Sequence, residues 1–128
     1  MSTWNWINRA VLLLLHDESL HEHGGASGLR DEGLLDSALA RPLHLLAYGE
    51  PDLADLAAAY GAGLAQNHAF VDGNKRAAFL AVGLFLLVNG HRLEASQVEA
   101  TLAMMELAAG HLSEAEFAQW VREHTARR

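Results

Sequence analysis

Apolar residues recur at helical spacing along most of this chain, and no stretch alternates long enough with the period of two that demands a sheet. A first helix is predicted from Trp4 to His16, with a buried face formed by Trp6, Ile7, Ala10, Leu13 and Leu14. The segment from Ser19 to Arg30 holds three glycines and indicates a mobile loop, with a short hairpin as an alternative. A second helix should follow, with Asp31 as its cap and Leu34, Leu35, Ala38 and Leu39 as its buried face. Pro42 is expected to end this helix or to start the next segment.

A third helix is predicted from Asp52, and its apolar stripe comprises Leu53, Leu56, Ala57, Tyr60 and Leu64. His68 continues this stripe at the next i+4 position, so it should end a core-facing row where the helix meets a loop. The fourth helix, Asn74 to about Asn89, is apolar nearly all round and is expected to be central and buried. Asn89-Gly90 is typical of a helix C-terminus.

Two capping boxes, Ser96-x-x-Glu99 and Ser113-x-x-Glu116, each predict the start of a further helix. The chain contains no repeat, low-complexity tract or linker, and 128 residues are enough for one core. The predicted architecture is therefore all-α, a compact helical bundle around a buried central helix, with residues 1–128 forming a single domain.

Composition narrows the function classes. The formal net charge of −7 argues against broad binding of nucleic acid, which needs a basic face. The absence of cysteine excludes disulfides and cysteine chemistry and fits a reducing compartment. The longest apolar run, Ala77 to Val88, is shorter than the roughly 20 residues that span a bilayer. A soluble cytoplasmic protein without membrane or direct nucleic-acid partners is expected.

The candidate chemistry lies in nine consecutive residues, His68 to Arg76. They place a proton acceptor (His68), a carboxylate (Asp72), a glycine turn and a capping amide (Asn74) before two cations at the start of the fourth helix. Cations are disfavoured there because a helix N-terminus already carries roughly half a positive charge. A bound anion, most often phosphate, resolves this conflict. The segment therefore predicts a site where His68 stands as a base beside a phosphate.

Each residue of this segment also has an ordinary structural interpretation. A histidine that ends an apolar stripe is more often a core or capping residue than a catalyst. Asp72-Gly73 alone suits a turn, Asn74 alone suits a helix N-cap, and Lys75-Arg76 alone suits a solvated pair. Their conjunction, with cations where a helix resists them, favours a functional site.

The segment His-Ala-Phe-Val-Asp-Gly-Asn-Lys-Arg resembles the core motif of the Fic/Doc family, and its Asn-Lys-Arg resembles the death-on-curing (Doc) branch. Further similarity is found at Leu15-His16-Asp17, Gly24-Gly25, residues 33–38 and Asn89-Gly90. The resemblance implies the helical Fic fold over essentially the whole chain.

The resemblance also implies a role for each residue of the motif. His68 matches the histidine that takes the proton from a target hydroxyl, and Asp72 matches the residue that binds Mg²⁺ on the nucleotide phosphates. Gly73 and Asn74 match the anion-holding turn, and Arg76 matches a phosphate-contacting arginine. Phe70 matches a residue that packs inward and holds the loop.

Two positions separate this chain from the AMP-transferring branch, which has glycine at the position of Lys75 and a second arginine at the position of Phe79. In the Doc branch the lysine accompanies transfer of the γ-phosphate of ATP. The resemblance therefore implies a toxin that phosphorylates a hydroxyl of a translation factor, expected to be elongation factor Tu, and blocks translation. Two alternatives remain open: AMP transfer to a protein hydroxyl, and a non-catalytic module that binds nucleotide or a partner.

The sequence lacks the motif by which many Fic proteins inhibit their own activity. Many Fic proteins silence themselves with a Ser/Thr-x-x-x-Glu helix, and no Ser or Thr of this chain precedes a Glu at that spacing. Control is expected from a separate antitoxin, which in Doc-type pairs contributes a disordered tail that folds on the toxin.

One alternative site lies outside the motif. His16, His21, Glu22 and His23 form a small histidine-rich cluster, and such clusters sometimes bind divalent metals. Their spacing matches no closed zinc site, so a solvated loop is the favoured interpretation.

Overall fold

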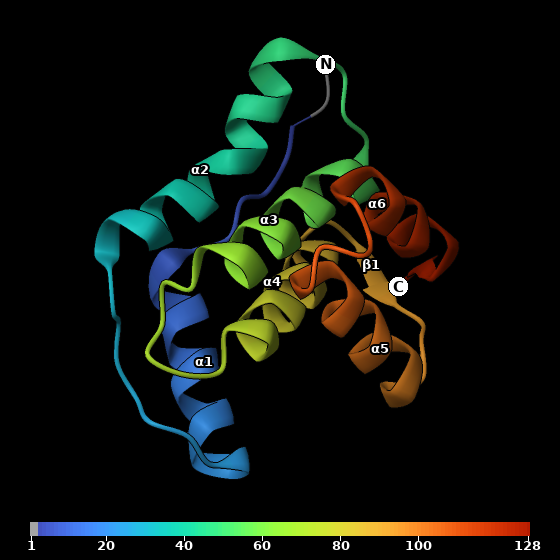
Figure 1. Cartoon of the computed structure of the whole chain (residues 1–128). Coiled ribbons are helices and arrows are strands. Elements are labelled where there is room, and N and C mark those ends of the chain that lie inside the picture. Colours follow the sequence, from blue (N-terminus) through green and yellow to red (C-terminus); the bar gives the residue numbers. More distant parts are fainter. Residues whose placement is uncertain (1–2) are drawn as a thin grey trace.

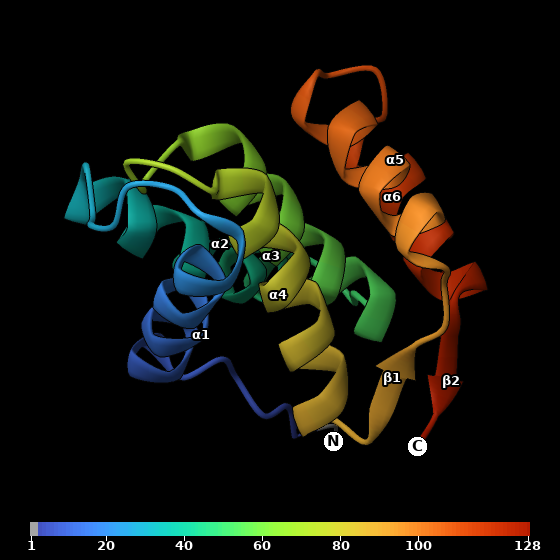
Figure 2. The same ribbon diagram turned by 90° about the horizontal axis from the view of Figure 1, so that it is seen from below.

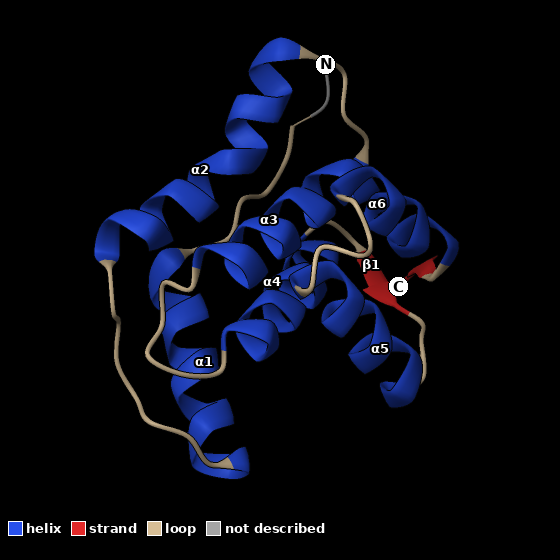
Figure 3. Cartoon of the chain, viewed as in Figure 1, coloured by secondary structure: helices blue, strands red, loops and turns tan. Residues whose placement is uncertain are grey.

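The computed structural model describes residues 3–128, and within this range the backbone forms helices joined by loops and one pair of short strands (Figures 1 and 3). The elements are α1 (Arg9–His23), α2 (Glu32–Tyr48), α3 (Leu53–Asn67), α4 (Asn74–Val88), β1 (His91–Leu93), α5 (Gln97–Ala108), α6 (Glu114–Glu123) and β2 (Thr125–Arg127). The all-α architecture is confirmed.

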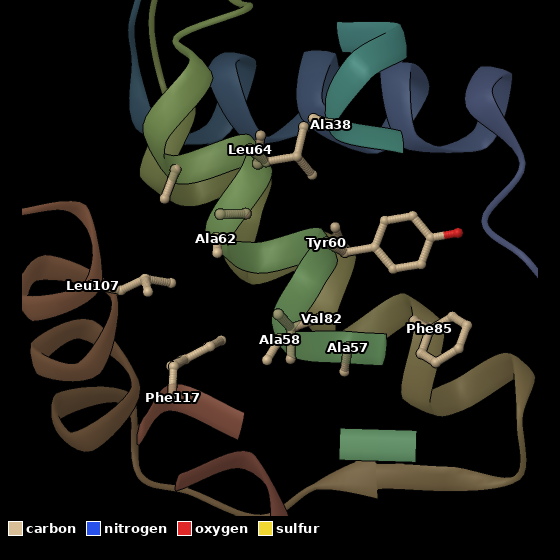
Figure 4. Close-up of a cluster of buried hydrophobic side chains, with 14 of the residues drawn as sticks. Ala38, Ala57, Ala58, Tyr60, Ala62, Leu64, Val82, Phe85, Leu107 and Phe117 are labelled. Atoms are coloured by element: carbon tan, nitrogen blue, oxygen red, sulfur yellow. The ribbon is translucent and has the colours of Figure 1, made fainter. Parts of the chain in front are cut away.

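The most deeply buried helix is α3, whereas the sequence predicted α4 as the centre. Every residue of α3 from Leu56 to Ala65 is buried, while α4 leaves Leu87 and Val88 exposed. Figure 4 shows side chains from several other helices around α3, including Ala38, Phe85, Leu107 and Phe117. The prediction was wrong because α3 is rich in alanine and glycine, whose small side chains give a weak hydrophobic signal but let neighbouring helices approach from every side.

Gly63 illustrates this close approach. A Cβ atom at Gly63 would lie 3.2 Å from the backbone Cα atom of Ala38 on α2, so a larger residue would push the two helices apart. The glycine therefore allows α2 and α3 to pack at short distance.

The remaining helices lie on two sides of the α3–α4 pair. In Figure 2, α1 and α2 lie on one side, and α5 and α6 lie on the other, with β1 and β2 side by side near the C-terminus. The strands pair antiparallel, with Arg92 opposite Ala126. Their three-residue length explains why no alternating pattern predicted them.

The first helix begins later and ends later than the sequence predicted. It starts after Asn8, whose side chain caps it, and its buried residues are Leu12, His16, Ser19 and Leu20 instead of the predicted face. Residues 4 to 7 are held by other partners: the Asn5 N–H donates to Asn89 Oδ1 at 2.9 Å. The Trp4 and Trp6 rings pack near Phe85 of α4. Long-range contacts therefore override the local helical pattern in this segment.

The predicted loop from Ser19 to Arg30 is helical in its first five residues, because α1 continues to His23. The alternative of a hairpin within the segment is also wrong. Instead, Leu29 forms an antiparallel bridge with Phe70, far away in the sequence. The C-terminal end of this segment therefore pairs with the loop that carries the motif, and not with another part of the same segment.

Pro42 neither ends α2 nor starts a new segment, since the helix continues through it to Tyr48. A proline inside a helix removes one backbone hydrogen bond. The ring of Pro42 is fully buried, and its burial offsets part of this loss.

The other helix boundaries predicted from the sequence are confirmed where local capping defines them. Asp31 caps α2, Asp52 caps α3, and the Ser96/Glu99 and Ser113/Glu116 capping boxes open α5 and α6. Asn89 ends α4, followed by Gly90 with a φ of 81°. None of the helices in residues 3–128 has the length and apolar character needed to cross a bilayer.

Candidate active site

A cavity of about 850 Å³ opens between the motif and α5, a size typical of small-molecule sites. One wall is formed by His68, Asp72, Gly73, Asn74, Lys75 and Arg76. The facing wall comes from α5 and includes Gln97, Thr101, Met104 and Met105. All the predicted site residues except Phe70 therefore line one cavity.

His68 lies at the C-terminal end of α3 and is exposed, so it does not continue the buried row of that helix as predicted. Its backbone is in the left-handed region, with φ 53° and ψ 48°, and it is the one non-glycine residue with positive φ among residues 3–128. This conformation costs a non-glycine residue free energy and occurs preferentially at functional sites. It turns the chain out of α3 while leaving the imidazole at the cavity.

Asn74 does not cap α4, contrary to prediction. Gly73 occupies the N-cap position, and no side chain caps the helix. The Asn74 side chain reaches back to the loop: its Oδ1 accepts from the Phe70 N–H at 3.0 Å, and its Nδ2 donates to the Phe70 carbonyl oxygen at 3.1 Å. Asn74 thus fixes the shape of the loop, and the first N–H groups of α4 stay free of side-chain partners.

The free start of α4 is also positively charged. Lys75 and Arg76 are the second and third residues of the helix, after Asn74, and neither forms an ion pair with any residue from 3 to 128. Unsatisfied N–H groups, the helix dipole and two free cations all favour an anion at this wall of the cavity.

The Asp72 carboxylate lies beside this cationic wall and is held by backbone donors. Its Oδ1 accepts from the Gly73 N–H at 2.9 Å and its Oδ2 accepts from the Ala26 N–H at 3.3 Å. Each oxygen keeps a further lone pair for another ligand. A single carboxylate next to a phosphate site suits Mg²⁺, which is usually held by one or two carboxylates together with substrate phosphates.

Phe70 points away from the cavity into the core, with 2% of its surface exposed. Its ring centroid lies 3.9 Å from that of His16 on α1. Burial lowers the pKa of His16, and the Asp72 backbone and the carboxylates of Asp17 and Asp72 oppose this shift. The contact between the Phe70 and His16 rings therefore holds the motif loop against α1 on the core side.

Three features of the site were not predicted from the sequence. The Arg30 guanidinium donates from Nε to the His68 carbonyl oxygen at 2.7 Å. The N–H groups of Arg30 and Asp31 both donate to the carbonyl oxygen of Ala69. The contribution of α5 to the cavity wall was also not predicted, because Thr101 and Met105 belong to no recognisable motif.

The alternative metal site at the histidine-rich cluster is not assembled. His16 is buried, whereas His21 and His23 are exposed side chains on the last turn of α1, so the cluster is helical and not a solvated loop. Nδ1 of His21 and Nδ1 of His23 lie within hydrogen-bond distance of carbonyl oxygens of their own helix. Across residues 3–128, no group of three or more acidic or histidine side chains is placed to hold a metal ion.

The Fic/DOC family matches residues 6–86 of this chain. The chain is similar to "Toxin Doc" of Mycolicibacterium smegmatis, with 52% identity over 75 residues, which cover 56% of this chain and 57% of that protein. It is also similar to "Protein kinase doc" of Escherichia phage P1, with 34% identity over 117 residues, which cover 91% of this chain and 92% of that protein. The first of these matches spans little more than half of its relative, whereas the second spans nearly all of it.

Proposed function

Because the chain belongs to the Fic/DOC family, we propose that it is a Doc-type toxin that transfers the γ-phosphate of ATP to a hydroxyl side chain of a protein. The observation that carries this proposal is that His68 and the cationic start of α4 line the same cavity. The names of the two relatives, a toxin and a protein kinase, support the same activity.

In this proposal the phosphates of ATP bind at the first turn of α4, where Lys75 and Arg76 and the free N–H groups stabilise their charge. Asp72 would hold Mg²⁺ against the phosphate oxygens, and the ion would supply further neutralisation of charge. His68 accepts the proton of the target hydroxyl as its oxygen attacks the γ-phosphorus, and ADP leaves.

Lys75 and Phe79 support transfer of the γ-phosphate instead of AMP. The lysine places a cation where a smaller residue would leave space, and Phe79 lines the cavity without offering a phosphate contact. Both features favour attack at the γ-phosphate over the α-phosphate. The expected target is elongation factor Tu, so modification would block translation in the cytoplasm.

A separate antitoxin is the proposed means of control. The chain carries no Ser/Thr-x-x-x-Glu sequence that could occupy the site from within. We propose that a disordered antitoxin tail folds on the toxin surface and suppresses the reaction.

The test uses the purified chain, Mg²⁺, elongation factor Tu and ATP labelled at either the α or the γ position. Label from the γ position on the factor, together with a phosphate-sized gain in mass, supports the proposal. Label from the α position with an adenylyl-sized gain overturns it in favour of AMP transfer. Nucleotide binding without any modification, also in a cell extract, overturns it in favour of a non-catalytic module.

A further inference from the structure

The segment that joins α1 to α2 runs antiparallel to the motif loop. Leu29 forms an antiparallel bridge with Phe70. One residue earlier in the segment, the Gly28 carbonyl oxygen accepts from the Val71 N–H at 3.1 Å. These backbone contacts hold the joining segment beside the loop and bring its first residues to the carboxylate of Asp72.

The two oxygens of the Asp72 carboxylate are held by donors from different parts of the chain. Oδ1 accepts from the adjacent Gly73 N–H at 2.9 Å, and Oδ2 accepts from the Ala26 N–H at 3.3 Å. Hydrogen bonds to both oxygens fix the direction in which a carboxylate presents its remaining lone pairs. Since Ala26 is 46 residues away in the sequence, this direction depends on how closely the joining segment approaches the loop.

Gly25 permits this close approach. A Cβ atom at Gly25 would lie 3.1 Å from Oδ2 of Asp72 and 2.8 Å from Cδ2 of Leu20. The Leu20 methyl group ends a flexible side chain and can turn aside, whereas Oδ2 would have to move away from the Ala26 N–H. The neighbouring Gly24 also has a positive φ, but no atom lies within 4 Å of its Cβ position. The contact with the carboxylate is therefore particular to position 25.

We propose that Gly25 and the Ala26 N–H position the Asp72 carboxylate for Mg²⁺, so that the segment between α1 and α2 supports the metal site. The inference rests on the proposed function, because it takes Mg-ATP as the ligand and Asp72 as the residue that holds the cation. Neither Gly25 nor Ala26 lines the cavity, so both act through Asp72 as positioning residues. Mg²⁺ demands nearly ideal octahedral geometry, and a displaced carboxylate therefore binds it less well.

The decisive variant is Gly25→Ala, which adds one methyl group beside the carboxylate and leaves its charge in place. Calorimetry measures the affinity of the variant for ATP twice, once with Mg²⁺ and once with EDTA. We expect the affinity with Mg²⁺ to fall about 10-fold, as the loss of a group that orients a metal ligand does. The affinity with EDTA should be unchanged. Gly24→Ala, at a position with positive φ but open space, is the matched control and should bind as wild type does in both solutions.

A double-mutant cycle separates positioning of the carboxylate from general damage to the loop. In the Asp72→Asn background, Gly25→Ala should cause no further loss of affinity, because the charge through which it acts is absent. Equal losses in both backgrounds, a loss that persists with EDTA, or wild-type affinity in Gly25→Ala would each overturn the inference while leaving the proposed function intact.

The backbone amide of Ala26 gives a second readout, in the wild-type protein. Its ¹H–¹⁵N resonance in the complex with ATP should shift when Mg²⁺ replaces EDTA, because the cation binds the carboxylate that accepts this N–H. An unmoved resonance would overturn the inference. If Gly25→Ala does not fold, this resonance alone decides. A wild-type protein that binds no Mg-ATP overturns both the inference and the proposed function.

Discussion

The Arg30 guanidinium donates from Nε to the backbone carbonyl oxygen of His68 at 2.7 Å, linking the segment before α2 to the end of α3. A second nitrogen, Nη2, lies 3.4 Å from the carbonyl oxygen of Asn67. A cation at a helix C-terminus is favourable, and here it also holds the residue that has left-handed backbone geometry. Arg30 therefore orients the proposed base without lining the cavity.

Replacing Arg30 by glutamine should lower the rate of transfer about 10-fold, because His68 then loses the contact that fixes its peptide group. The free energy of unfolding should fall by only about 1 kcal/mol, since the arginine is exposed. Single-turnover kinetics and thermal unfolding measure the two effects. Arg92→Gln, an exposed arginine paired with Glu94, is the matched control. An equal loss of rate in both variants would exclude a specific role for Arg30.

Removal of the imidazole at position 68 should abolish most of the activity. His68→Asn suits the left-handed conformation and His68→Ala tests the loss of the side chain, and both should reduce the rate by about 10²–10⁴. Circular dichroism should show a retained fold because the side chain is exposed. His44→Ala, at an exposed position on α2, should keep full activity. A fully active His68→Ala protein would exclude His68 as the base.

Replacing Lys75 should lower the activity but raise the stability of the protein. Lys75→Met is expected to reduce phosphoryl transfer at least 10²-fold, as losing a phosphate contact in an electrostatic site does. The same change removes a cation from the start of α4 and should raise the free energy of unfolding by about 0.3–1 kcal/mol. Kinetics and chemical denaturation of one preparation test both effects. A less stable variant with normal activity would contradict the anion site.

Asp72 should control the dependence on Mg²⁺. Asp72→Asn keeps an oxygen that can accept the Gly73 N–H but removes the charge that a hard cation prefers. Titration of Mg²⁺ at fixed ATP should show half-maximal activity shifted at least 10-fold to higher concentration. Glu50→Gln, an exposed residue outside this cavity, is the control. An unchanged titration curve would show that Asp72 forms the turn but does not bind Mg²⁺.

Acid should weaken the contact between α3 and α6. Arg122 lowers the pKa of Asp52 from 3.8 to about 2, chiefly through hydrogen bonds that join Nε and Nη2 to the carboxylate. A lowered pKa means that this stabilisation is complete above about pH 4 and is lost as the pH falls toward 2. The carboxylate is half exposed, so the effect is below about 1 kcal/mol.

Asp52→Asn tests this acid dependence, because asparagine keeps the helix cap while removing the charge. Urea unfolding of the variant between pH 5 and 2.5 should give a shallower loss of stability than wild type. Glu50→Gln, which changes a neighbouring carboxylate without an ion pair in residues 3–128, should follow the wild-type curve. Parallel curves for Asp52→Asn and wild type would show that the ion pair contributes nothing.

The sequence by itself determined the features that depend on residues three or four positions apart. Asp31, Asp52, Ser96 and Ser113 start helices because their side chains bind N–H groups of the next turn, and these interactions are readable from spacing alone. The grouping of His68 with residues 72–76 at one cavity was predictable for the same reason, since these residues lie within one loop and one helical turn. The predicted cap at Asn74 was not correct, because its side chain binds the loop backbone instead.

Tertiary structure alone decided which helix is central, which side chains support the loop and what faces it across the cavity. Trp4 and Trp6 leave the helical pattern because Asn89 and Phe85 hold their segment. Arg30 contacts His68, which lies 38 residues away in the sequence, and His16 contacts Gly73, which is farther still. Met105 lines the cavity from α5. Such contacts form where helices pack at close range, and the small side chains of α3 that permit this packing carry little hydrophobic signal of their own.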